Sequence, residues 1–164
     1  MLKYRKLMDI FPWLIVVLWM LLIFNFSAQP AQNSDKLSLG VTEKVVETVE
    51  KVTPETEFNL ESLNHIVRKN AHFFIYLALA IWVQIALRIN RVIGIKRPLI
   101  VFGICVLFAI SDEFHQLFVA GRGAQVKDVF IDSAGAIVGI VIYGIVNRFS
   151  LKKRKKKSVK PLMR

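Results

Sequence analysis

The stretch IFPWLIVVLWMLLIFNF, residues 10–26, holds 17 consecutive uncharged and almost wholly apolar residues. A run of this kind is typical of a helix that crosses a membrane, since about 20 apolar residues span the hydrocarbon layer. Pro12 falls in the first turn, where a helix tolerates proline. Trp13 lies near the N-terminal end of the run, at the membrane interface, where tryptophan is favoured. The stretch predicts a first membrane span over residues 10–27.

A cleaved signal peptide is the alternative for this stretch, because Lys3, Arg5 and Lys6 precede it and it ends near Ala28. Phe26, however, interrupts the pattern of small residues that signal cleavage requires, and two tryptophans lie inside the run. These features favour a retained span.

Three further uncharged runs occupy residues 70–87, 98–111 and 133–147. The last two have 14 and 15 residues, too few to cross a hydrocarbon layer about 30 Å thick, so the spans extend into flanking segments that contain acids. With 54% hydrophobic residues and a mean hydropathy of +0.47, the composition excludes an ordinary water-soluble domain. We predict an all-α membrane protein, a single domain over residues 1–164 with spans at about 10–27, 70–88, 98–119 and 128–147.

The basic residues predict how this four-helix bundle is oriented. Segments on the side of the two termini hold 16 Lys and Arg residues, against 7 on the other side. The positive-inside rule then places both termini and the basic tail, residues 148–164, in the cytoplasm, and the loop at residues 28–69 outside. The tail is expected to touch anionic headgroups and not nucleic acid, because no aromatic residues are interleaved with its charges.

The outer loop contains a pattern typical of a short amphipathic helix, between Leu37 and Val52. Its apolar residues recur at helical spacing, at Val41, Val45, Val49 and Val52, and Gly40 and Pro54 bracket the segment. We expect this helix to pack on the bundle or to lie at the membrane interface; a gate over a site is the alternative. The single cysteine, Cys105, lies in an apolar run and is expected to act as a small hydrophobic residue.

Polar residues collect at one end of the predicted bundle, because spans two, three and four alternate in direction. Each helix offers one polar face there, comprising Arg68, His72 and Tyr76, then Asp112, His115 and Gln116, then Asp128 and Asp132. Ionisable groups at membrane depth face one another or a wet cavity. Two interpretations remain open, a functional polar pocket or a structural network that pairs Arg68 or Arg122 with Asp112, Glu113 or Asp132.

Small residues near this end suggest how the helices meet and turn. Gly135 and Gly139 lie four apart on the face of Asp132, a spacing typical of close helix packing in membranes. Gly121 and Gly123 flank Arg122 and leave its side chain with little steric cover. A guanidinium presented in this way suits a phosphate or a carboxylate.

Together these residues resemble the VanZ-like family of small bacterial membrane proteins, over about residues 10–147. The matching motifs are Ser27-Ala28-Gln29-Pro30, Arg68-Lys69-Asn70-Ala71-His72, Ser111-Asp112-Glu113-Phe114-His115-Gln116, Gly121-Arg122, and Asp128 through Asp132 to Gly135. The best-known member of that family is associated with low-level resistance to teicoplanin, a glycopeptide that targets lipid-linked cell-wall precursors. The resemblance implies a location in the bacterial cell membrane and a role in the cell envelope, but no mechanism.

The first functional hypothesis is a non-enzymatic envelope protein that binds a lipid headgroup, a glycopeptide or a cell-wall intermediate in an outward-facing pocket. Cationic side chains would hold anionic groups, and acids and amides would meet hydroxyls or amines. The candidate ligand-binding residues are Arg68, Lys69, His72, Asp112, Glu113, His115, Gln116, Arg122, Asp128 and Asp132. Membrane lipids are further expected partners, and the oligomeric state is left open.

The second hypothesis is an integral-membrane hydrolase or transferase that acts on a lipid-linked phosphate substrate. His72 or His115 would serve as acid or base, an acid among Asp112, Glu113 and Asp132 would assist, and Arg122 would steady phosphate charge. A metal site built from His72, Asp112, His115 and Asp132 is a third possibility, but no close-spaced metal motif exists. We therefore predict no metal and no cofactor.

Overall fold

The computed structural model describes the backbone of residues 2–51 and 59–159, and the side chains of residues 8–49, 51 and 59–150. All regular structure in these residues is helical. The helices are α1 (Leu2–Ser27), α2 (Ala31–Glu50), α3 (Leu60–Ile89), α4 (Lys96–Gln116) and α5 (Val126–Val159).

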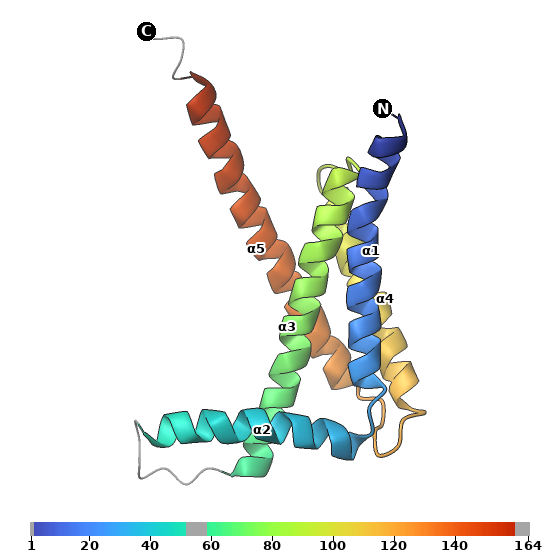
Figure 1. Cartoon of the computed structure of the whole chain (residues 1–164), viewed down its shortest axis with the longest axis vertical. Coiled ribbons are helices and arrows are strands. Elements are labelled where there is room, and N and C mark those ends of the chain that lie inside the picture. The colour runs from blue at the N-terminus through green and yellow to red at the C-terminus, as the bar shows by residue number, and fades with distance from the viewer. Residues whose placement is uncertain (1, 52–58, 160–164) are drawn as a thin grey trace.

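Four of these helices are long and apolar enough to cross a membrane, over Met8–Ser27, Leu60–Ile89, Lys96–Gln116 and Val126–Ser150. Helices α1, α3 and α4 pack side by side, α5 crosses α3 and leans away, and α2 lies across one end of the bundle (Figure 1). The start of α1 and the end of α5 lie at the opposite end (Figure 1). The prediction of an all-helical membrane protein with four spans is confirmed.

Helix α3 forms the centre of the bundle and contacts every other helix. Its residues Tyr76, Leu79, Ala80 and Val83 are completely buried, in one core cluster with residues of α1, α4 and α5. Trp19 of α1 donates a hydrogen bond from Nε1 to the Ile75 carbonyl oxygen, 3.0 Å away. The bundle is thus held by close packing around one helix rather than by a large aromatic core.

Helix α5 crosses α3 where glycines let the two backbones meet. A Cβ added at Gly135 would collide with the carbonyl oxygen of Phe73, and one added at Gly139 with that of Leu77. This is the close packing that the sequence predicts. It brings the first turns of α5 against the middle of α3 and so positions Asp128 and Asp132.

All four spans lie in helices that differ in length from the predicted ranges, since α1 begins at Leu2 and α5 runs on to Val159, into the predicted tail. Helix α3 begins ten residues earlier, at Leu60, because the Asn59 side chain accepts a hydrogen bond from the Ser62 amide at 3.0 Å and caps it. Helix α4 ends at Gln116 instead of Val119, because the next three amides donate to carbonyls only three residues back and tighten the chain into a turn.

Helix α2 is longer than predicted, and Gly40 lies within it rather than at its start. The Ser38 and Thr42 hydroxyls donate to carbonyls one turn back, which ties down the helix around the glycine. Its apolar stripe does not pack on the bundle: Leu37, Val41 and Val45 are 44–59% exposed, whereas Thr42 is fully buried. A place at the membrane interface stays a prediction, and Val52 and Pro54 lie outside the described residues.

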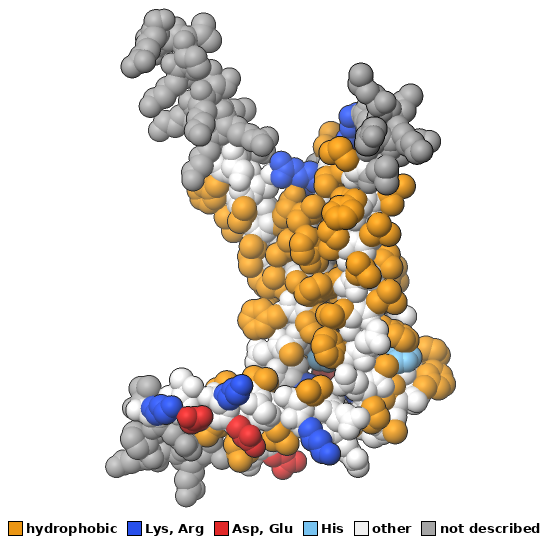
Figure 2. Space-filling view, in the orientation of Figure 1, with side chains coloured by type: hydrophobic (Ala, Val, Ile, Leu, Met, Phe, Trp, Pro, Cys, Tyr) orange, Lys and Arg blue, Asp and Glu red, His pale blue; other side chains and the backbone are white. Residues whose placement is uncertain are grey.

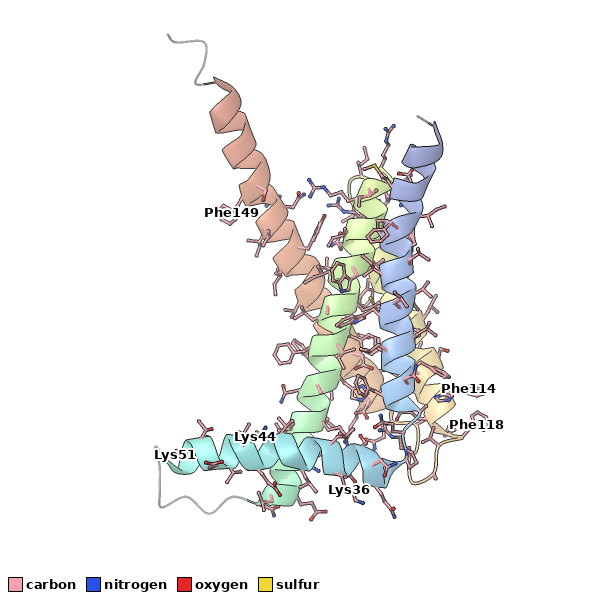
Figure 3. All side chains as sticks on the ribbon, viewed as in Figure 1. Lys36, Lys44, Lys51, Phe114, Phe118 and Phe149 are labelled. Carbon is pink, nitrogen blue, oxygen red and sulfur yellow. The ribbon has the colours of Figure 1, made fainter. Side chains whose placement is uncertain are left out.

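The outer surface of the spans is rich in apolar side chains, which cover most of the visible bundle (Figure 2). Phe114 and Phe118 point away from the bundle near the pocket end, and Phe149 points away from α5 (Figure 3). Their exposed fractions, between 63% and 76%, are costly in water and suit contact with lipid.

Candidate functional site

A polar pocket lies at the end of the bundle that α2 crosses, between α3, the end of α4 and the start of α5. Its volume is about 90 Å³. Its polar lining consists of His65, Arg68, Lys69, His72, Gln116, Arg122, Gln125 and Asp128. Six of the ten ligand-binding candidates from the sequence thus line one cavity.

The sequence reasoning missed two of the lining residues, His65 and Gln125. His65 lies three residues before Arg68 and seven before His72, so helical spacing alone would have placed it on their face of α3. Gln125 lies in the α4–α5 loop, where no periodic pattern predicts orientation. Its backbone amide donates to Glu113 Oε2 at 2.7 Å and ties that loop to α4.

The loop that carries Arg122 is fixed against the connection between α1 and α2. Gly121 adopts a positive φ of 75°, which glycine tolerates, and the Ala31 amide donates to the Ala120 carbonyl oxygen at 3.2 Å. Arg122 Nε donates to the Gln29 carbonyl oxygen at 2.9 Å. Burial, and then the positive charge of Arg68, lower the pKa of Arg122 from its ordinary value. The pocket therefore holds two guanidinium groups close enough to repel one another.

Unlike Arg122, the pocket residues Arg68 and Lys69 are paired with acids. Arg68 forms an ion pair with Asp35 of α2, and Lys69 Nζ lies 3.1 Å from Asp128 Oδ1. The network considered from the sequence, Arg68 or Arg122 with Asp112, Glu113 or Asp132, is absent from the ion pairs among the described side chains. Asp35 lies outside the predicted spans, so the sequence offered no pattern that paired it with α3.

Three carboxyl groups lie behind the pocket, on α4 and α5. Asp112, Glu113 and Asp132 are only 0–4% exposed. Asp132 Oδ1 lies 3.7 Å from His72 Nδ1, which links it to the pocket wall. Oδ1 of Asp112 and Oε1 of Glu113 have no hydrogen-bond partner among the described residues. Buried carboxyl groups with so few partners are costly to the fold, which is typical of functional sites.

Gln116 connects the buried acids to the pocket. It is 5% exposed and lines the cavity, and its Nε2 donates to Ser27 Oγ at 2.8 Å and to Asp112 Oδ2 at 3.4 Å. The amide therefore joins the end of α1 to α4. A change at Asp112 would be transmitted to the pocket through this side chain.

His115 is the one candidate that the structure sets apart from the others. Its ring stacks on Phe24 of α1, with the ring centroids 4.1 Å apart, and it does not line the pocket. The set His72, Asp112, His115 and Asp132 is therefore not assembled. Across the described side chains, no three His, Cys, Asp or Glu residues are grouped so that they could hold a metal ion.

Comparison with known proteins identifies a family for most of the chain. Residues 11–147 match the VanZ/LLP1 family, and this range contains the whole pocket and all four spans except the first three residues of α1's span and the last three of α5's. No curated protein and no solved structure matches the chain significantly. Because the match covers most of its length, the chain belongs to the VanZ/LLP1 family.

Proposed function

We propose that this membrane protein binds the anionic group of a lipid-linked or other cell-wall-related ligand in the pocket, at the outer face of the cell membrane. The observation that carries the proposal is the position of Arg122. Its Nε is held by the Gln29 carbonyl oxygen, its other nitrogens remain for a ligand, and no described carboxylate forms an ion pair with it. A guanidinium held in this way matches a phosphate or a carboxylate.

The size of the pocket limits what it can enclose. A site that buries a whole drug-sized molecule has a volume of roughly 300–1,000 Å³, whereas this cavity measures about 90 Å³. A phosphate or carboxylate fits, but a complete glycopeptide does not. The rest of the ligand would lie along the membrane surface, near α2 and the exposed rings of Phe114 and Phe118.

Membership of the VanZ/LLP1 family supports a role in the cell envelope. The best-known member of the VanZ-like family is associated with resistance to teicoplanin, a compound that acts on lipid-linked cell-wall precursors. Such precursors carry phosphates. An outward-facing pocket with Arg68, Lys69 and Arg122 in its wall suits ligands of this class. Glycopeptide tolerance is therefore the phenotype that we expect to depend on the pocket.

The direct test is to incubate the purified protein with a panel of lipid-linked cell-wall precursors and with teicoplanin, and to follow binding and turnover by mass spectrometry. Arg122→Gln should weaken binding by about tenfold or more, because a charge-assisted contact is lost. Lys36→Gln is the matched control, since Lys36 is an exposed residue of α2 outside the pocket lining (Figure 3). Equal affinities of the two variants would refute the proposal.

A second candidate function, hydrolysis or transfer at a lipid-linked phosphate, is favoured by one specific contact. His72 lines the pocket, and Nδ1 of its ring lies 3.7 Å from the fully buried Asp132. A carboxylate beside a histidine orients the ring for general acid–base catalysis. Under this alternative, His72→Gln should abolish turnover and leave binding intact. Binding without turnover in the native protein would exclude it.

A further inference from the structure

A second cationic cluster lies at the opposite end of the bundle from the pocket. It comprises Arg88 in the last turn of α3, Arg97 in the first turn of α4, and Tyr143 of α5. Arg88 Nη1 lies 3.4 Å from Tyr143 Oη, and Arg97 Cζ lies 5.6 Å from the centroid of the Tyr143 ring. Two guanidinium groups thus flank a single tyrosine, and three helices contribute to one site.

Among the described side chains, neither arginine of this cluster has an acidic partner within ion-pair distance. The four ion pairs among the described side chains lie on α2 and at the pocket end, and none includes Arg88 or Arg97. Arg97 Nε is buried and makes no hydrogen bond. The first turn of α4 contains no acid and no side-chain cap, so its free amides add to the positive potential. The cluster lacks an anion that would balance it.

The position of the cluster indicates where that anion comes from. Arg88 lies 19 residues after Lys69 on the same helix, or about 29 Å along its axis, close to the roughly 30 Å thickness of the hydrocarbon layer. If the pocket cations lie at one membrane surface, Arg88 lies at the other, at the depth of the lipid phosphates. Figure 2 shows basic side chains at the base of the notch between α5 and the rest of the bundle.

An amide group beside the cluster would suit the rest of a headgroup. Asn147 lies one turn after Tyr143 and shares its face of α5, on the side away from the bilayer centre. Its side-chain carbonyl oxygen has no hydrogen-bond partner among the described residues. Such an oxygen accepts hydrogen bonds from hydroxyl groups, such as those of a glycerol headgroup.

We infer that Arg88, Arg97 and Tyr143 form a binding site for the phosphate of an anionic phospholipid, in the leaflet opposite the pocket. The two guanidinium groups donate to the phosphate oxygens, and the Tyr143 hydroxyl adds a third donor. Basic clusters between membrane helices are suited to such headgroups. The lipid phosphate would contact α3, α4 and α5 at the end where α5 leans away from α3 (Figure 1), and would hold these helices in place.

The test uses the purified full-length protein in detergent, titrated with short-chain phosphatidylglycerol, with phosphatidylcholine of the same chain length, and with sodium phosphate. Binding is read by native mass spectrometry and by the rise in melting temperature. Phosphatidylglycerol should bind about tenfold or more tightly than either other compound, since charge, chains and hydroxyls act together. Equal binding of inorganic phosphate would overturn the assignment to a lipid.

Variants locate the site and separate it from general electrostatic attraction. The double variant Arg88→Gln with Arg97→Gln should lose this preference. Arg91→Gln with Lys96→Gln removes the same charge from the same loop without touching Tyr143, and should keep it. Equal losses in the two double variants would overturn the inference.

Two conservative single substitutions test the inference if the double variant fails to fold. Arg97→Lys keeps the charge but loses the planar guanidinium, and Tyr143→Phe loses only the hydroxyl, so both should weaken phosphatidylglycerol binding. Unchanged affinity in both would overturn the inference. Arg122→Gln, which alters the pocket, should leave phosphatidylglycerol binding at this lipid site unchanged. The two proposed sites can therefore be tested independently of one another.

Discussion

Asp132 combines complete burial with a weak partner more clearly than the other acids behind the pocket. Its side chain is fully buried, and its ion pair with His72 is long, at 3.7 Å. A charge in such a position costs several kcal/mol unless it is well paired, and an apolar residue would pack there more cheaply. The presence of a carboxyl group at this position is better explained by its effect on the orientation of the His72 ring than by stabilisation of the bundle.

This explanation predicts that Asp132→Asn separates function from folding. The amide is nearly isosteric, so the melting temperature in detergent should stay within about 2 °C of that of the native protein, a change of about 1 kcal/mol or less in a chain of this size. Glycopeptide tolerance conferred by overexpression should be lost, because His72 loses its anionic partner. Asp112→Asn and Glu113→Gln should behave in the same way.

Glu61→Gln, at an exposed position at the start of α3, is the control for this series and should preserve both properties. If all three acid variants keep the phenotype, the pocket is not the functional site. If all three fail to fold, the acids serve the structure.

Among the helices, the contact between α3 and α5 decides the geometry of the pocket. Gly135 and Gly139 bring α5 onto the carbonyl groups of Phe73 and Leu77, which directly follow His72 and Tyr76 in α3. The same approach sets Asp128 opposite Lys69 and Asp132 opposite His72. A wider helix separation would break both pairs together.

Gly139→Val should therefore destabilise the protein by about 1–3 kcal/mol, the usual cost of forcing extra atoms into a packed contact. Gly144→Val is the matched control on the same helix, since a Cβ there meets no atom within 4 Å. The unfolding midpoint of each variant in detergent, measured by loss of helical circular dichroism, checks the difference. Similar midpoints for the two variants would contradict the role of the close contact.

In the whole molecule, charge and helix direction combine to give the two ends different character. The structure places the start of α1 and the end of α5 at one end and the pocket at the other (Figure 1). The distribution of basic residues predicts that the first of these ends is cytoplasmic. The pocket then faces outward.

Alkaline phosphatase fusions test this orientation. A fusion at Arg164 should be inactive and one near Glu57 active, because the enzyme matures only outside the cytoplasm. The opposite pattern would show that the protein has the opposite orientation in the membrane, although the pocket residues would still lie on one side.

Accessibility to water tests whether the pocket is open in the membrane. In a Cys105→Ala background, Asp128→Cys should react with an impermeant thiol reagent added from outside, because Asp128 lines the cavity. Lys36→Cys, on exposed α2, is the positive control, and Ile137→Cys, on the outer surface of α5, should stay unlabelled within the bilayer. Protection of Asp128→Cys in folded protein would show that the pocket is closed.

The amino-acid sequence by itself determined the four spans and the gathering of polar residues at one end. Uncharged runs bounded by charges can only form successive crossings, because each unpaired charge and each free backbone group is costly in lipid. Alternation of direction then brings the polar ends of spans two to four together. Helical spacing was sufficient to place Arg68 and His72 on the face that lines the pocket, whereas Tyr76, predicted on the same face, is buried in the core.

Only the tertiary structure decided which of these groups meet. Arg68 pairs with Asp35 rather than with a buried acid, His115 turns to Phe24, and the apolar stripe of α2 remains exposed. The same holds for the cluster of Arg88, Arg97 and Tyr143, whose arginines the sequence placed only among the basic residues on the side of the termini. Such contacts depend on the rotation and crossing of helices, and these are set by packing across the whole bundle, as where Gly135 and Gly139 of α5 pack against α3.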